Sequence, residues 1–181
     1  MKTVSLIMSA YNEEKTVGNV LDKLLYLDYL HEIVVVDNGS NDSTYDIIIK
    51  AKEKDNRIKI FRLEKNKGLG CGLRLAIENT VGEIVVRQDA DLEYDPNELI
   101  YLVEIIDRGL ADVVYGSRLL VRKTHRVHYY YSYLANVIIT IFSNLLTNLY
   151  LSDVETAAKA FRGDIVRKIK WKSKGFEIEN E

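Results

Sequence analysis

The strongest constraint on the fold is the alternation of short apolar runs with segments of helical periodicity. Strands are expected over residues 4–9, 32–37, 57–63, 82–88 and 111–117. The segments at 4–9, 32–37 and 82–88 contain the apolar runs of buried strands, whereas 57–63 alternates between apolar and charged residues. Helices are expected between them over 14–27, from Asp42 or Ser43 to about Lys54, near 70–80, and from Pro96 to about Arg108. This order predicts an α/β fold, Rossmann-like, in which a mostly parallel sheet carries helices on both faces.

The composition agrees with a single globular domain. The 181 residues suffice for one hydrophobic core, and 47% apolar with 29% charged residues is typical of a folded chain. A net charge of −2 gives no overall field that would favour nucleic acid. The single cysteine, Cys71, excludes a disulfide framework and favours a reducing compartment. We expect residues 1–181 to form one domain, truncated at its C-terminus because no closing helix or cap follows "GFEIENE".

Polar and glycine-rich segments follow the predicted strands, where ligands bind in parallel α/β sheets. They read "AYNEE", "DNGSNDST", "EKNKGLGCG", "DADLE" and "GSR". The fourth belongs to "VRQDADLEYDP", which places Asp89, Asp91, Glu93 and Asp95 close together. Like charges this close repel, so either a cation shares the site or the side chains separate into water. Oxygen ligands from Asp91 and Glu93 suit Mg²⁺ or Mn²⁺, whereas Asp95 is expected to cap the helix that starts at Pro96.

Two other motifs fit less well. An EF-hand loop requires glycine and glutamate where this chain has Tyr94 and Ile100. A dinucleotide-binding glycine motif should follow the first strand, whereas "GLGCG" (68–72) follows the third. A turn that lets the backbone approach a ligand or a neighbouring strand is a sufficient account of these glycines.

The sequence changes character after Arg118. Residues 121–131, "VRKTHRVHYYY", are basic and aromatic, and residues 132–151 are apolar but interrupted by serine, threonine and asparagine. These interruptions disfavour a transmembrane span and favour a buried or interfacial helix. A basic, tyrosine-rich segment beside an apolar helix can rest on anionic headgroups. We therefore expect a cytoplasmic protein at the cytoplasmic face of a membrane, with a core helix of a larger protein as the alternative.

Four segments, "SAYNEE", "VVVDNGSNDST", "NKGLGCGLRLAI" and "RQDADLEYDP", resemble the inverting family 2 glycosyltransferases of the GT-A fold. Within that family the chain is most similar to the dolichol-phosphate mannosyltransferase and polyprenyl-phosphate glycosyltransferase branch, and "SNLLTNLYLSDVETAAKAFR" resembles its later motifs. The resemblance implies transfer of a hexose, with inversion, from a GDP-mannose or UDP-glucose type of donor to a polyprenyl or dolichyl phosphate. It also implies Mg²⁺ or Mn²⁺ as cofactor.

The resemblance assigns roles to the residues at the strand ends. Those expected to contact the donor are Ala10, Tyr11, Glu13, Asp37, Asn38, Lys67, Gly70, Asp89 and Ala90. Asp37 and Asn38 should lie near the base, although a second aspartate is usual where Asn38 stands. In the Asp-x-Asp motif of residues 89–91, Asp89 would face the sugar or ribose, and Asp91 with Glu93 would hold the metal.

The acceptor phosphate is expected to meet arginines that follow the fifth strand, Arg118, Arg122 and Arg126. Asp89, Asp91 and Arg118 are accordingly the expected catalytic residues. Two alternatives stay open: a nucleotide-sugar-binding domain without turnover, and a transferase acting on a hydroxyl, for which Asp153 or Glu155 would serve as base. A nucleotidyltransferase is disfavoured because "SAYNEEKTV" contains no glycine-rich basic loop.

Overall fold

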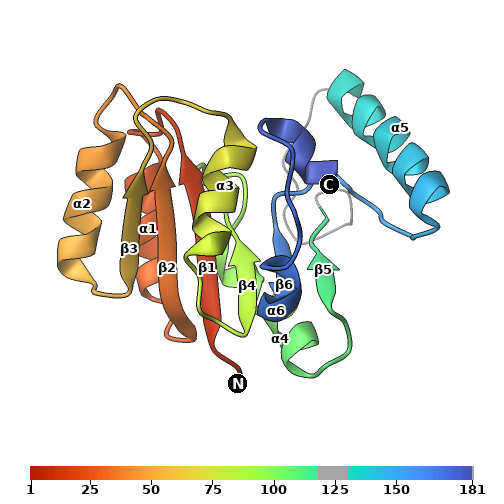
Figure 1. Cartoon of the computed structure of the whole chain (residues 1–181), viewed down its shortest axis with the longest axis horizontal. Coiled ribbons are helices and arrows are strands. Elements are labelled where there is room, and N and C mark those ends of the chain that lie inside the picture. The colour runs from red at the N-terminus through yellow and green to blue at the C-terminus, as the bar shows by residue number, and fades with distance from the viewer. Residues whose placement is uncertain (118–129, 181) are drawn as a thin grey trace.

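The structure, a computed structural model, describes residues 1–117 and 130–180 and contains a six-stranded sheet of order β3-β2-β1-β4-β6-β5 (Figure 1). The strands are β1 (Val4–Ala10), β2 (Leu30–Asp37), β3 (Ile58–Arg62), β4 (Ile84–Arg87), β5 (Val113–Tyr115) and β6 (Lys159–Arg162). The pairs among β1 to β4 are parallel, whereas β6 runs antiparallel to both β4 and β5. The predicted mostly parallel sheet is confirmed, but β6 was not expected from the sequence.

Helices cover both faces of the sheet, as predicted. The helices of the described residues, of which α5 does not lie on the sheet, are α1 (Val17–Leu25), α2 (Thr44–Lys54), α3 (Leu69–Glu78), η1 (Pro96–Glu98), α4 (Leu99–Asp107), α5 (Tyr130–Thr147), α6 (Gly163–Val166) and η2 (Phe176–Asn180). Successive strand residues face opposite sides, so Met8 and Val35 pack against α1, α2 and α4, while Ile7 and Val34 pack against α3 (Figure 1). Asp95 begins η1 as expected, because its carboxylate accepts the Asn97 N–H at 3.2 Å.

The glycine-rich turn before α3 packs against a segment far away in the sequence. Gly68 has a φ of 90°, and a Cβ on it would collide with the carbonyl oxygen of Lys174. A Cβ on Gly70 would collide with the carbonyl oxygen of Ser173 in the same way. These glycines therefore allow a close backbone approach, and the approaching backbone belongs to the C-terminal segment rather than to a neighbouring strand.

Helix α5 stands away from the sheet, and Thr140 is its buried residue (Figure 1). Asn136, Thr140 and Asn144 recur every four residues and bond to the returning segment 151–154, beginning with Asn136 Nδ2 to the Asp153 carboxylate at 2.8 Å. These three polar interruptions of the apolar run thus form one stripe that attaches the helix. None of the described helices, α5 included, is long and apolar enough to cross a membrane.

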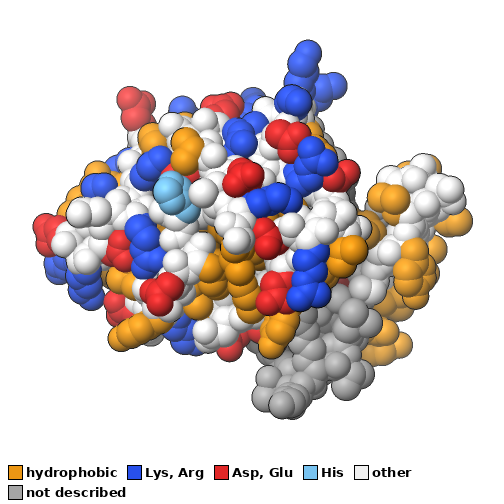
Figure 2. All heavy atoms as spheres, turned by 90° about the horizontal axis from the view of Figure 1, so that it is seen from below, with side chains coloured by type: hydrophobic (Ala, Val, Ile, Leu, Met, Phe, Trp, Pro, Cys, Tyr) orange, Lys and Arg blue, Asp and Glu red, His pale blue; other side chains and the backbone are white. Residues whose placement is uncertain are grey.

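The rest of the α5 surface is apolar and exposed. Its exposed large side chains are Tyr130, Tyr131, Tyr133, Leu134, Ile138, Ile139, Ile141, Phe142, Leu145 and Leu146. Figure 2 shows hydrophobic side chains along this helix at the right of the view. Within this chain the helix is not buried and has an open apolar surface. An interfacial helix and a core helix of a larger protein both stay predictions.

A buried carboxylate joins three strands at the edge opposite the polar strand ends. Glu32 of β2 is 3% exposed and accepts hydrogen bonds from the Ser5 hydroxyl and, at 2.7 Å, from the Val81 N–H. Lys59 of β3 lies 2.5 Å from its other oxygen. Burial by itself would raise the pKa of Glu32, but the hydrogen bonds and the Lys59 charge outweigh it and hold that pKa below its ordinary value.

Replacing Glu32 by glutamine should lower the free energy of unfolding at neutral pH by about 2 kcal/mol, because the amide leaves these donors without a charged acceptor. A lowered carboxyl pKa stabilises the fold above the ordinary pKa, and this contribution is lost as the pH falls through the lowered value. The difference between wild type and variant should therefore shrink in acid. Urea denaturation at neutral and acidic pH measures it, with the exposed Asp22→Asn as control. Equal loss at both pH values would contradict the prediction.

Candidate functional site

The carboxyl ends of β2, β1 and β4 meet at one edge of the sheet. Ala10, the last residue of β1, pairs with Asp37, the last residue of β2. The Asn38 N–H donates to the Ala10 carbonyl at 2.8 Å, and the Gln88 N–H donates to the Ile7 carbonyl at 3.1 Å. The predicted site residues of three separate segments are thereby brought to a common edge.

The loop after β1 is tied to the loop after β2. Asn12 has a φ of 54°, and its N–H donates to the Ser40 hydroxyl at 3.0 Å. The Glu13 N–H donates to the Thr44 hydroxyl at 2.7 Å, and the Glu13 carboxylate accepts the Thr16 hydroxyl at 2.5 Å. Tyr11 at the tip is 40% exposed. This bonding fixes Glu13 on the site side while leaving the Tyr11 ring accessible.

Asp37 lies inside the turn after β2 and is fully buried. Its carboxylate accepts the Ser40 N–H at 3.2 Å and pairs with the Arg62 guanidinium at 3.0 Å. Arg62, the last residue of β3, also stacks over the Tyr45 ring at 4.1 Å. Asp37 therefore stabilises the turn. Its partner Arg62 is half-exposed and was not among the residues predicted from the sequence.

Asn38 holds the loop that leads into α3. Its side-chain oxygen accepts the Lys67 N–H at 3.1 Å, and its side-chain nitrogen donates to the Gly68 carbonyl at 3.0 Å. The Lys67 side chain is exposed, while Gly70 is buried against Ser173. Both ends of the Asn38 amide thus act on backbone, a role that a carboxylate could fill only in part because it cannot donate.

Replacing Asn38 by aspartate should consequently destabilise the loop. The Gly68 carbonyl would lose its donor and face a negative charge, which is expected to lower the free energy of unfolding by about 1–3 kcal/mol. Thermal and urea unfolding measure the effect, and Asn41→Asp, at an exposed position nearby, is the matched control. Wild-type stability in Asn38→Asp would show that the amide donor is dispensable.

Four carboxylates gather around the Asp-x-Asp motif. Asp91 lies in the loop after β4, and its Oδ1 accepts the Glu93 N–H at 2.9 Å. Burial, with smaller contributions from the charges of Asp89, Glu93 and Glu13, raises the pKa of Asp91 to about 6 despite that hydrogen bond. The repulsion expected from the sequence is therefore present, and it is centred on Asp91.

The chemistry of this group suits a divalent cation. In the described residues no three Asp, Glu, His or Cys side chains gather tightly enough to hold a metal ion by themselves. Mg²⁺ and Mn²⁺ are commonly held by one or two carboxylates together with the phosphates of a ligand. Asp91 and Glu93 supply such oxygens, and a cation would offset the repulsion at Asp91. Asp91 and Glu93 are therefore chemically suited to hold the metal, and their role as metal ligands stays a prediction.

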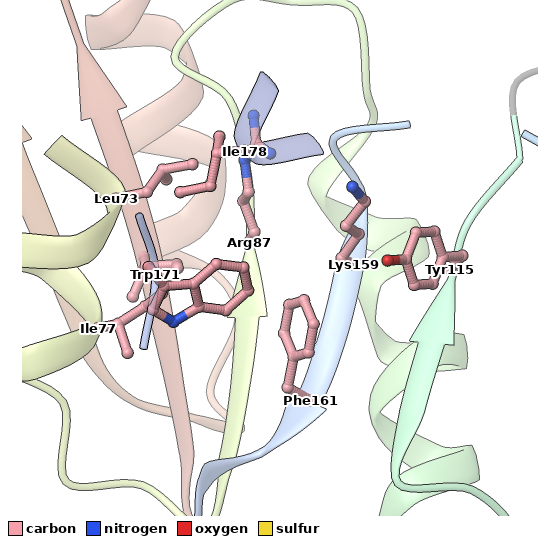
Figure 3. Close-up of a pocket in the computed structure, with 9 residues that line it drawn as sticks. Leu73, Ile77, Arg87, Tyr115, Lys159, Phe161, Trp171 and Ile178 are labelled. Carbon is pink, nitrogen blue, oxygen red and sulfur yellow. The ribbon is translucent and has the colours of Figure 1, made fainter. Parts of the chain in front are cut away.

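Two buried cations lie behind the motif and were missed by the sequence reading. Arg87, the last residue of β4, and Lys159, the first of β6, are each 4% exposed. They line a pocket with Tyr115 and with apolar side chains that include Phe161 and Trp171 (Figure 3). A charge at the end of the apolar run "IVVR" was a usable signal for Arg87, whereas nothing marked Lys159 before its strand was known.

The predicted acceptor residues all fall outside the described part of the chain. Arg118, Arg122 and Arg126 all belong to residues 118–129. Strand β5 ends at Tyr115, and Ser117 is the last described residue before them. The role of these arginines in binding the acceptor phosphate therefore stays a prediction from the sequence.

A mostly parallel sheet with helices on both faces and acidic strand ends at one edge is the architecture of the GT-A glycosyltransferase fold. Glucosyl-3-phosphoglycerate synthase from Mycobacterium tuberculosis, solved with Mn²⁺, UDP and glucosyl-3-phosphoglycerate, superposes with a TM-score of 0.77 at 21% identity. The match covers 99% of this chain and 63% of that one. The likeness establishes the fold that was predicted.

The chain belongs to glycosyl transferase family 2, whose family model matches residues 5–169. It is 30% identical over 176 residues to the UDP-N-acetylglucosamine–dolichyl-phosphate N-acetylglucosaminyltransferase of Methanococcus voltae, covering 88% of this chain and 69% of the relative. It is 29% identical over 171 residues to an undecaprenyl-phosphate 4-deoxy-4-formamido-L-arabinose transferase of Photorhabdus laumondii, covering 92% of this chain and 51% of that relative. The chain thus spans about half to two thirds of the length of these curated relatives.

Proposed function

We propose that this chain is the catalytic domain of a metal-dependent, inverting glycosyltransferase that transfers a hexose from a nucleotide-diphosphate sugar to a polyprenyl phosphate. The observation that carries the proposal is the acidic motif at the end of β4, set beside the ends of β1 and β2 in a family 2 chain. The names of the relatives supply the acceptor class, because they specify undecaprenyl and dolichyl phosphates.

The donor would lie across the carboxyl edge of the sheet. Tyr11 is accessible there to a nucleoside, and Asp91 with Glu93 would hold Mg²⁺ or Mn²⁺ near the diphosphate. Such an ion, when bound, stabilises the negative charge that grows on the departing nucleoside diphosphate. Asp89, which is partly exposed, would orient the sugar so that attack comes from the face opposite the leaving group.

A lipid phosphate suits this site better than a hydroxyl acceptor. It is already an anion near neutral pH, so it requires cations for binding and no general base. Of the two candidates for a base, Glu155 is partly buried, and Asp153 is 1% exposed and accepts a hydrogen bond from Asn136 that attaches α5. Its placement favours a structural role. Arg118, Arg122 and Arg126, which follow β5 in the sequence, are proposed to bind the acceptor phosphate.

We assign the acceptor side of the molecule to the surface of a membrane, at its cytoplasmic face. Helix α5 presents an open apolar surface, and it follows the basic segment 121–129 directly in the sequence. An apolar helix face with neighbouring positive charge is the pattern of peripheral binding to anionic bilayers. A lipid acceptor would then be drawn from the bilayer next to the donor.

The test is a transfer assay with the purified protein, Mn²⁺ and a short-chain polyprenyl phosphate, run with radiolabelled UDP- and GDP-sugars. Formation of a labelled lipid that depends on the divalent ion is the expected result. Donor binding without transfer or hydrolysis would instead identify a binding domain. Transfer to a sugar hydroxyl with no use of the lipid phosphate would overturn the acceptor assignment.

A further inference from the structure

Arg87 is a buried charge directly behind the acidic motif. The three residues before it in β4 are fully buried, and its own side chain is 4% exposed. Placing a guanidinium in such surroundings is unfavourable by several kcal/mol unless an anion and hydrogen bonds compensate it. Its Nη2 donates to Asp89 Oδ1 at 2.9 Å, so the compensating anion includes the first aspartate of the motif.

The surroundings of Arg87 strengthen that pair. Lys159, on the neighbouring strand, is a second buried cation, and its ammonium lies 4.7 Å from the centre of the Tyr115 ring. Phe161 and Trp171 close the pocket below the two cations in Figure 3. Because water is largely excluded, the attraction between the guanidinium and the Asp89 carboxylate is screened less than at the surface. Asp89 is therefore held from the protein side.

The two aspartates of the motif consequently differ. Asp89 is 28% exposed in its side chain and is bonded to a fixed cation behind it. Asp91 lies within the electrostatic influence of Asp89, Glu93 and Glu13, and its carboxylate accepts a hydrogen bond from the Glu93 N–H. The protein thus supplies positive charge to Asp89 through Arg87, whereas the neighbours that act on the Asp91 carboxylate include three negative charges.

We propose that Arg87 is a positioning residue that fixes the direction of the Asp89 carboxylate toward the donor sugar and keeps it out of the coordination of the cation. This inference rests on the proposed function. It explains why two aspartates separated by one residue take different roles, and it adds to the site a residue that never touches the substrate.

A double-mutant cycle on Arg87 and Asp89 tests the proposal with kcat, donor KM and Mn²⁺-dependent donor affinity as readouts. Arg87→Met should lower kcat by about 30-fold or more while changing the Mn²⁺ requirement little, since residues that act as a pair have coupling of this order. In an Asp89→Asn background the same substitution should add less than about threefold. Arg87→Lys keeps the positive charge on a side chain of different length and geometry, so it should recover part of the lost kcat.

The control is Arg162→Met, which removes an ion-paired arginine from the adjacent strand at the opposite edge of the sheet and should leave kcat unchanged. Thermal unfolding checks each variant. If Arg87→Met does not fold, the cycle is run with Arg87→Lys. The loss of kcat that this substitution causes should again be smaller in the Asp89→Asn background. Losses that are equal in both backgrounds, or an Arg87→Lys variant no better than Arg87→Met, overturn the proposal.

Failure of the proposed function is visible separately in the wild-type protein. If it binds the donor but does not turn it over, the transferase assignment fails, and the cycle is measured on the donor Kd. The same non-additivity between Arg87 and Asp89 is expected there, and additive effects on Kd reject the positioning role.

Discussion

Asp91→Asn should weaken the binding of a nucleoside diphosphate in the presence of Mn²⁺ by at least about tenfold, equivalent to about 1.4 kcal/mol. Asp91 is the carboxylate on which the charges of Asp89, Glu93 and Glu13 converge, so a cation gains most from its ionised form. An amide removes that charge but keeps the shape of the side chain. Calorimetric titration with UDP and GDP, with and without Mn²⁺, measures the effect.

The matched control for this experiment is Asp95→Asn. Asp95 belongs to the same acidic stretch, but its carboxylate caps η1 through the Asn97 N–H. The control should lose some stability and keep its affinity for the nucleotide. If wild-type affinity is the same in a chelator as in Mn²⁺, the metal role of Asp91 is wrong whatever the variants do.

Placing two negative charges on α5 should reduce binding to anionic vesicles by at least about tenfold, because each fully inserted leucine contributes roughly 1.5–3 kcal/mol. Leu145 and Leu146 are suited to this test because they are 75% and 86% exposed, so Leu145→Glu with Leu146→Glu should not disturb the core. Co-sedimentation with vesicles of mixed neutral and anionic lipid gives the bound fraction.

Tyr26→Glu is the control for a general effect of added negative charge. Tyr26 is 85% exposed but follows α1, far from α5 in the sequence and outside its surface. The double variant should lose vesicle binding and the control should keep most of it. Equal binding by all three proteins, or a wild type that stays in the supernatant, would contradict a membrane role for α5.

The sequence predicted those parts of the fold that short-range patterns determine. Strands β1, β2 and β4 read as continuous apolar runs and β3 as an alternating one, so these strands and β5 were found together with the helices between them. Strand β6 has four residues, "KAFR", two of them charged, and its partners in β4 are distant in the sequence, as in the pair of Val85 with Phe161. Antiparallel pairing at this distance leaves no local pattern, which explains why β6 was missed.

The site residues at the strand ends could be predicted from the sequence. The residues that pack behind them and pair with them could not. Parallel topology brings Ala10, Asp37 and Asp89 to one edge, and that could be inferred in advance. The partners of these residues, Arg62 for Asp37 and Arg87 for Asp89, follow from side-chain directions that only the folded chain defines. The open surface of α5 was likewise undetermined, because an apolar helix reads the same whether it is covered or exposed.

The position of β6 between β4 and β5 imposes an order on the assembly of the chain during synthesis. Until residues 159–162 have left the ribosome, β4 has an unpaired edge and β5 has no neighbour to join. Pairing across so many residues is slow because the connecting chain must first be ordered, and an open strand edge meanwhile invites pairing with another molecule. Strands β3, β2, β1 and β4 can pair early, whereas the part of the sheet that carries the Lys159 pocket has to wait until residues 159–178 have been synthesised.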